Sequence, residues 1–198
     1  MIHRDKAALA VADLLVALGV EEGEHTAGTP QRVAGAWAEA LAGYDDDPAR
    51  HLQRCFGGPA DPGLVVVSGI RIASTCAHHL LPIMGVATVA YRPHPGDQIV
   101  GLSKLVRVVQ VYARRLQVQE RLGYQVAGAV QDCLAPIGAA CVITAAHGCM
   151  AWRGVRDHDA VTTTQALSGD WRAEHPDFRS ALVEHDAAAR PARSRAFS

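Results

Sequence analysis

The sequence predicts an α+β protein built on an antiparallel sheet of about four strands. Three observations lead to this fold class: the first 44 residues have helical spacing, runs of β-branched residues begin near residue 64, and two further helical segments separate these runs from a second group of strands. Because helices and strands are grouped rather than strictly alternating, the pattern favours an antiparallel sheet over a doubly wound parallel one.

The first half of the chain predicts two helices followed by strands. Residues 7–18 form the first helix, and Thr29-Pro30 opens the second with a cap residue and a proline at the first helical position. The acidic run 45–47 before Pro48 ends that second helix. Strands are predicted at residues 65–67, 70–72 and 86–91, with a turn at residues 94–97.

The second half predicts a helix pair and two more strands. Ser103 is a good helix cap, and apolar residues continue at helical spacing to Leu116. A second helix covers residues 119–134, and strands are predicted at 141–145 and 161–165. The tail from Ala187 lacks periodicity and is expected to be disordered. A four-stranded sheet has two open edges, so pairing between subunits is a plausible outcome.

The composition is that of one globular domain. The 198 residues are 49% apolar, and 19 basic against 20 acidic side chains leave a formal net charge of −1. This balance gives no field that would attract nucleic acid or an anionic membrane, so neither is an expected partner. The longest apolar stretch, residues 7–20, contains Asp13 and is shorter than the roughly 20 residues of a membrane span. It is followed by acidic residues at the place where an export signal would be cleaved. We therefore expect a cytoplasmic protein with five reduced cysteines.

The strongest chemical signal is a group of cysteines and histidines. Cys76 and His79 are separated by two residues, and Cys149 follows His147 much later in the chain. Two thiolates and one imidazole can hold zinc and leave a fourth position for water, as in catalytic zinc sites. His78 and His147 would lie beside the ion as candidate proton carriers. Spacing alone leaves two alternatives open, a structural Cys₂His₂ site and simply buried thiols.

A second group of candidates is cationic. Ser103, Lys104 and Arg107 lie at a predicted helix start, Arg153 follows Cys149 closely, and Arg32 lies near the start of the second helix. A helix N-terminus with Lys or Arg beside it suits phosphate, although each of these charges could equally be solvated.

One carboxylate also stands out. Glu120 could accept two hydrogen bonds from the adjacent N–H donors of a guanine edge, or it could be a surface charge. The sequence does not separate these two interpretations.

Together these pieces resemble GTP cyclohydrolase I, and the resemblance runs from about Val11 to about Asp170. The matching stretches are Thr29-Pro30-Gln31-Arg32, Ser74-Thr75-Cys76-Ala77-His78-His79, residues 101–105, residues 114–122, His147-Gly148-Cys149 and Arg153-Gly154-Val155-Arg156.

The resemblance implies a role for each matching residue. Cys76, His79 and Cys149 match the family's zinc ligands, His78 and His147 its proton-transfer histidines, and Glu120 the carboxylate that anchors guanine. Ser103, Lys104, Arg107, Arg153 and Arg32 match positions that hold the triphosphate or lie close to it.

The resemblance also implies a fold, an assembly and a reaction. The fold is the tunnelling fold (T-fold), with a helix pair on one face of the sheet and an N-terminal helical extension, and it assembles as a toroidal homodecamer with sites between subunits. The corresponding division of the chain is a helical region at residues 1–50, a catalytic domain at 51–186 and a tail at 187–198. The implied reaction converts GTP and water to 7,8-dihydroneopterin triphosphate and formate. Two alternatives are a paralogue that releases a ring-opened intermediate or serves deazapurine synthesis, and a non-catalytic zinc-stabilised nucleotide-binding or scaffold protein.

Two positions depart from the family pattern. The residue after Cys76 is usually acidic and is Ala77 here, which removes a carboxylate that could support a metal ligand. Gly148 is smaller than the usual residue and is expected to loosen local packing. Neither position is a predicted ligand, so we expect activity to be retained.

Overall fold

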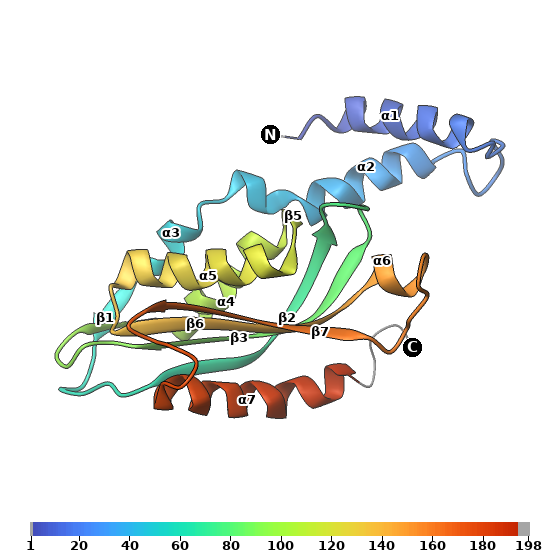
Figure 1. Cartoon of the computed structure of the whole chain (residues 1–198). Coiled ribbons are helices and arrows are strands. Elements are labelled where there is room, and N and C mark those ends of the chain that lie inside the picture. Colours follow the sequence, from blue (N-terminus) through green and yellow to red (C-terminus); the bar gives the residue numbers. More distant parts are fainter. Residues whose placement is uncertain (1, 194–198) are drawn as a thin grey trace.

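The computed structural model describes residues 2–193, with side chains described through Arg190, and its centre is a five-stranded sheet (Figure 1). Four strands are antiparallel neighbours in the order β2 (Val65–Cys76), β3 (Pro82–Arg92), β6 (Gly138–His147) and β7 (Val161–Gly169). The fifth, β5 (Leu116–Gln117), pairs parallel to the end of β2. A separate pair joins β1 (Cys55–Gly57) to β4 (Gln98–Val100). The predicted α+β class is confirmed. The prediction of about four strands did not include the short strand β5.

Helices cover both faces of the sheet. On one face lie α4 (Leu102–Ala113) and α5 (Gln119–Leu134), and on the other lies α7 (Pro176–Arg193) (Figure 1). Successive side chains of β3 point to opposite faces of the sheet, so Val89 packs in the core under α4 and α5 while Ala90 packs with Phe178 of α7. The helix pair on one face was predicted correctly.

Two segments in the second half of the chain differ from the prediction. Leu116 was expected on the helix that begins near Ser103, but α4 ends at Ala113 and Leu116 lies in β5. The expected disorder from Ala187 is wrong for residues 187–193, which continue α7, while residues 194–198 lie outside the described part.

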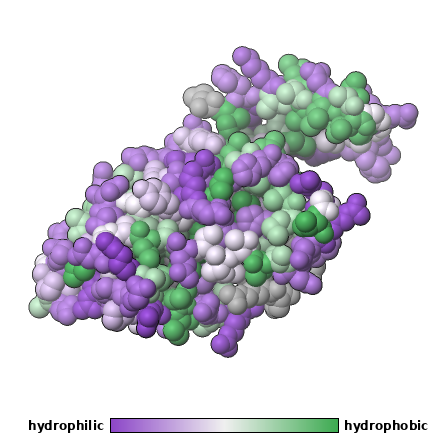
Figure 2. Space-filling model, viewed as in Figure 1, coloured by the Kyte–Doolittle hydropathy of each residue, from purple (hydrophilic) through white to green (hydrophobic). Residues whose placement is uncertain are grey.

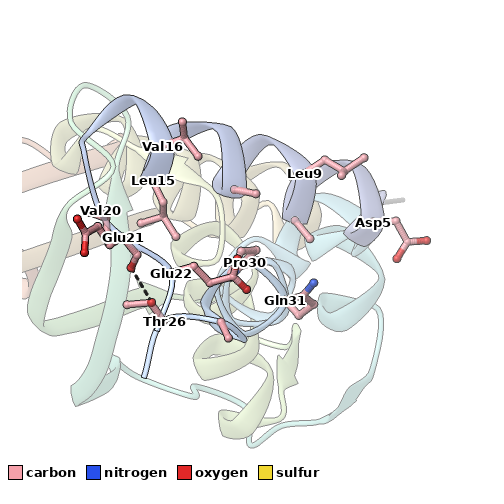
Figure 3. A pocket seen from close by; sticks show the side chains of 13 residues that line it. Asp5, Leu9, Leu15, Val16, Val20, Glu21, Glu22, Thr26, Pro30 and Gln31 are labelled. Atoms are coloured by element: carbon pink, nitrogen blue, oxygen red, sulfur yellow. Dashed lines mark hydrogen bonds between the residues drawn. The ribbon is translucent and has the colours of Figure 1, made fainter. Parts of the chain in front are cut away.

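The N-terminal helices form a hairpin that projects from the sheet layers. It consists of α1 (Arg4–Ala17) and α2 (Thr29–Ala40), and apolar side chains gather on its surface (Figures 1 and 2). A groove of about 550 Å³ lies between the two helices, lined by Leu9, Val16 and Pro30 among others (Figure 3). No helix within the described residues is long and apolar enough to cross a membrane.

Short helices connect the hairpin to the sheet. The acidic run does not end α2, which stops at Ala40 before η1 (Ala42–Asp45). Asp47 instead begins α3 (Pro48–Leu52), since its carboxylate accepts a hydrogen bond from the Ala49 N–H.

The sheet topology brings distant segments to one end. Both β2 and β6 are antiparallel to β3, so they run in the same direction and end close together. The turn after Cys76 and the short helix α6 (Gly148–Ala151) after His147 therefore emerge at the same end of the sheet. The next strand, β5, leads into α5 at this end as well.

Candidate metal centre and active site

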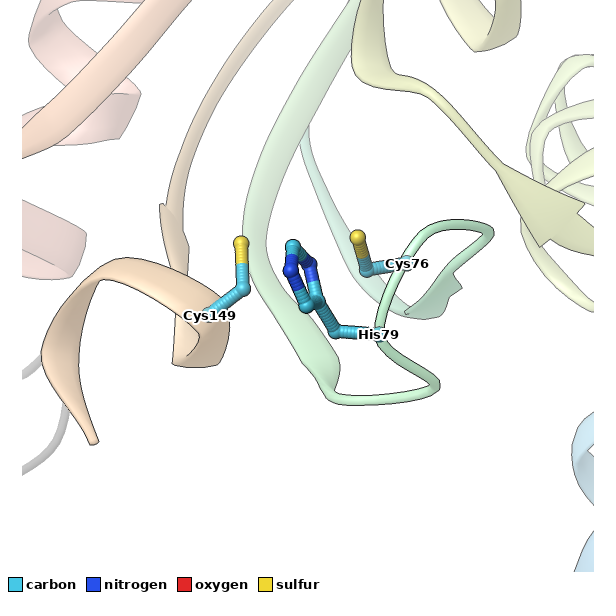
Figure 4. A group of neighbouring side chains, drawn as sticks. All are labelled: Cys76, His79 and Cys149. Atoms are coloured by element: carbon cyan, nitrogen blue, oxygen red, sulfur yellow. The ribbon is translucent and has the colours of Figure 1, made fainter. Parts of the chain in front are cut away.

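Three of the predicted site residues form a compact cluster. The ligand atoms of Cys76, His79 and Cys149 all lie within 4.8 Å of one another (Figure 4). Tetrahedral zinc with bonds of about 2.3 Å to sulfur and 2.0 Å to nitrogen would hold its ligand atoms about 3.5 to 3.8 Å apart. The cluster needs only small movements to reach this geometry. The thiol of Cys76 is buried and His79 is exposed, so the cluster opens toward solvent on the histidine side.

A tight turn brings His79 back beside Cys76. The Cys76 N–H donates to the Leu81 carbonyl at 2.8 Å, and the Leu80 N–H donates to the Cys76 carbonyl at 2.9 Å. Leu80 has a φ of 57°, a left-handed conformation that is unfavourable for leucine. The chain accepts this strain at the residue next to a candidate ligand.

The third ligand depends on close packing at Gly148. A Cβ atom at this position would lie 3.1 Å from Cδ of Pro82 and 3.2 Å from its carbonyl oxygen. The expectation that glycine loosens this region is wrong, because Gly148 is buried and lets α6 approach the start of β3 closely. Burial, followed by the neighbouring Cys76 thiol, raises the pKa of the Cys149 thiol. A bound cation would act in the opposite direction by stabilising the thiolate.

His147 is held by a glutamine that the sequence analysis missed. Its Nε2 lies 2.7 Å from Oε1 of Gln119, whose Nε2 donates to the carbonyls of Ile143 at 3.1 Å and Thr162 at 2.9 Å. Carbonyl oxygens only accept, so the amide orientation is fixed and its oxygen must accept from His147. His147 therefore carries its proton on Nε2 and keeps Nδ1 as the basic nitrogen.

The charge state of His147 is set by two opposing effects. Burial lowers the pKa of this half-buried imidazole, and the negative charge of Glu120 opposes that shift. Glu120 is exposed in the first turn of α5, next to Gln119. The sequence signal that could have identified Gln119 is its position next to Glu120, because Gln119 and Glu120 both lie in the stretch 114–122 that resembles the family.

Arg153 also reaches the cluster, and His78 lies at its margin. Nη1 of Arg153 lies 3.1 Å from Nε2 of His79. Because a guanidinium can only donate, Nε2 accepts here and the neutral His79 ring carries its proton on Nδ1. An ion bound by His79 must replace either this hydrogen bond or that proton. The exposed His78 ring lies edge-on to the His79 ring, with 6.3 Å between centroids.

The remaining candidates for triphosphate binding do not lie at the end of the sheet that carries the cluster. Ser74 donates to the Ala113 carbonyl at 2.6 Å, so the last turn of α4 lies beside β2 near Cys76. Ser103 and Lys104 lie at the opposite end of this helix, which is about 18 Å long for its 12 residues, and Arg107 lies at its middle.

Arg107 and Arg32 have other surroundings. Arg107 lines a separate hollow of about 180 Å³ with Asp46 and His51. Arg32 donates to the His25 carbonyl at 2.9 Å within the N-terminal hairpin. One chain by itself therefore places Arg153 beside the cluster, but not the other predicted triphosphate contacts.

The fold and the cluster define an α+β protein with a Cys₂His site suited to a metal ion, flanked by an oriented histidine and a carboxylate. A family profile described as GTP cyclohydrolase I matches residues 7–185. The chain therefore belongs to the GTP cyclohydrolase I family of enzymes.

Named relatives agree with this assignment. The chain is 48% identical over 163 residues to GTP cyclohydrolase 1 of Chlorobaculum tepidum, which covers 82% of this chain and 72% of that protein. It is 50% identical to the protein of the same name from Chlorobium phaeovibrioides, with 72% of this chain and 63% of that protein covered. For the protein of Mycolicibacterium vanbaalenii the identity is 44%, with 89% and 88% covered. The match to an apo structure of an archaeosine synthase QueF-Like protein covers 56% of this chain and 98% of that chain, at a TM-score of 0.44 and 17% identity.

Proposed function

We propose that this chain is a zinc-dependent GTP cyclohydrolase I, which converts GTP and water to 7,8-dihydroneopterin triphosphate and formate in the first step of tetrahydrofolate and pterin synthesis. The observation that carries this proposal is the convergence of Cys76, His79 and Cys149 at 4.8 Å or less, next to His147. The donor set of two sulfurs and one nitrogen fits zinc, and zinc at such a site lowers the pKa of water toward neutrality.

The residues around the cluster suit the proton transfers of this reaction. Nδ1 of His147 is free to take a proton, because Nε2–H is engaged by Gln119. The lowered pKa of His147 keeps the ring neutral, and therefore basic, near pH 7. His78 would be the second proton carrier, positioned beside His79 on the exposed side.

Substrate orientation comes from charges on both sides of the cluster. The Glu120 carboxylate would accept two hydrogen bonds from the N–H donors of guanine. Arg153 would turn from His79 toward the triphosphate once an ion takes up the histidine lone pair. A fixed substrate lets several steps occur in one pocket, since orientation supplies much of the rate enhancement.

A second copy of the chain would supply the remaining triphosphate contacts. Ser103 and Lys104 lie most of a helix length from the turn of Cys76, and Arg107 lies about half that far, which supports sites formed between subunits. The strand β7 forms one edge of the sheet, and only Thr75–Cys76 of β2 pair with β5 at the other. We infer a toroidal homodecamer of T-fold subunits in the cytoplasm, with residues 51–186 as the catalytic domain, residues 1–50 as a helical region and Arg32 close to the triphosphate.

The test is turnover of GTP by purified protein with measured zinc content. The expected result is formate together with a product that becomes a fluorescent pterin after oxidation. Zinc-loaded protein that yields neither formate nor pterin would overturn the proposal. Product mass distinguishes the less favoured paralogue, because a ring-opened intermediate retains one additional water.

A further inference from the structure

The backbone of the turn that carries Cys76 and His79 is hydrogen-bonded on one side to β5. The Ala77 N–H donates to the Gln117 carbonyl at 2.9 Å, and the strand register pairs Cys76 with Gln117. The supporting strand β5 is only two residues long. A ladder this short contributes little by itself, so other contacts must hold β5 in place.

The side chain of Gln117 provides such contacts. It is 1% exposed, and its Nε2 donates to the Tyr112 carbonyl at 2.8 Å and to Oε1 of Gln125 at 2.9 Å. Its Oε1 accepts from Nε of Arg121 at 3.1 Å. Since a carbonyl only accepts and a guanidinium only donates, the amide has one possible orientation. Gln117 therefore joins β5 to the end of α4 and to α5.

Arg121 also makes a hydrogen bond to the backbone of β5. Besides its bond to the Gln117 side chain, its Nη2 donates to the Leu116 carbonyl. Both residues of β5 are thus bonded to one guanidinium on α5. The same helix begins with Gln119 and Glu120, which face His147. The Arg121 guanidinium consequently fixes the position of the turn of Cys76 relative to Gln119 and its partner His147.

We propose that Arg121 is a positioning residue that acts through Gln117 to hold Cys76 and His79 in metal-binding geometry. The inference rests on the proposed metal site, but it adds residues that touch neither the ion nor the substrate. Loss of a group that hydrogen-bonds directly to a ligand typically weakens metal binding by about 10- to 100-fold, so the more remote Arg121 should act at the lower end of that range. Arg121 is exposed, and the core of α5 is formed by other residues, so its removal should spare the fold.

The experiment compares Co²⁺ binding by full-length Arg121→Met with Arg172→Met. Arg172 is a matched control, because it is also an exposed arginine that donates to backbone carbonyls, those of Gly169 and Trp171. Affinity is measured by competition with a chelator, and ligand geometry by the visible absorption of bound Co²⁺. We expect Arg121→Met to bind Co²⁺ about 10-fold more weakly with an altered spectrum, Arg121→Lys to be intermediate, and Arg172→Met to match wild type.

The outcomes separate the two proposals. Wild-type affinity and spectrum in a folded Arg121→Met protein would overturn the positioning role while leaving the metal site intact. Wild-type protein that binds no Co²⁺ would overturn the metal site itself. If circular dichroism shows Arg121→Met to be unfolded, Arg121→Lys against Arg172→Lys decides, and equal affinity of that pair would reject the role of Arg121.

Discussion

Replacing Gln119 tests whether this residue sets the proton affinity of His147. In Gln119→Glu, a carboxylate would replace the amide oxygen that lies 2.7 Å from Nε2 of the imidazole. Two unit charges about 4 Å apart interact by about 4 kcal/mol at an effective dielectric constant of 20, which corresponds to roughly 3 pKa units. The carbonyls of Ile143 and Thr162 already face this side chain and would partly oppose the new charge. We therefore expect the pKa of His147 to rise by about 1 to 3 units.

The sign of the effect on activity follows from the role of a base. In the proposed role of a base, His147 must be neutral to take a proton, so we expect activity to increase as pH rises through its pKa. Gln119→Glu should move the acid limb of the kcat profile to higher pH by the same 1 to 3 units. Gln119→Met is the matched neutral control, because it removes the hydrogen bond without adding charge. NMR titration of the His147 ring measures the pKa directly.

One result would refute this reasoning. If the His147 ring titrates at its wild-type pH in folded Gln119→Glu, with the new carboxylate ionised, the two side chains are not coupled as the structure indicates. An equal upward shift in Gln119→Met would also refute it, since no charge is added there.

Three further predictions concern the cluster and its supports. Cys149→Ser should lose most bound zinc by elemental analysis while retaining its circular dichroism, whereas Cys133→Ser, an exposed thiol elsewhere, should keep full zinc content. Arg153→Met should bind Co²⁺ more tightly than wild type, because the Arg153 guanidinium donates to the His79 lone pair in the absence of metal. The same variant should bind GTP more weakly. Unchanged Co²⁺ affinity, measured against a chelator, would show that Arg153 and the ion do not compete for His79. The hydrogen bond from His51 lowers the pKa of Asp46 below 3.8, so its stabilisation is complete above that value and is lost as pH falls through the lowered pKa. Urea unfolding between pH 6 and 3 should show this loss in wild type and a smaller one in His51→Gln.

The three candidate ligands could be predicted because their residue types carry a chemical signal, whereas most of the predicted triphosphate contacts are not beside them in one chain. Cys76 and His79 are two residues apart on one turn, so spacing made them candidates together with Cys149, and the resemblance to the family implied that all three are ligands. Gln119 was missed because a glutamine side chain carries no chemical signal of its own, and only its place beside Glu120 could have drawn attention to it. Its role depends on the carbonyls of two strands that only the folded sheet brings together.

The errors in the fold have similar causes. Helix α7 was missed although Phe178, Ala181, His185 and Ala189 are buried at helical spacing, because alanine and histidine give a weak apolar pattern. Leu116 fitted a helical face, yet α4 had already ended, and parallel pairing with Thr75 places it in β5. A two-residue parallel strand has no sequence signature of its own, because its partner lies some 40 residues away.

The proposed metal centre would also discriminate between alternative alignments of the sheet. Cys76 ends one strand, and Cys149 follows the end of another, and both strands are aligned against β3 through their backbone pairing. Successive side chains on a strand point to opposite faces, so sliding β2 by a single residue would turn the first thiol away from the second. Only the native alignment could then capture an ion, and metal uptake during refolding would report when the strands have paired correctly.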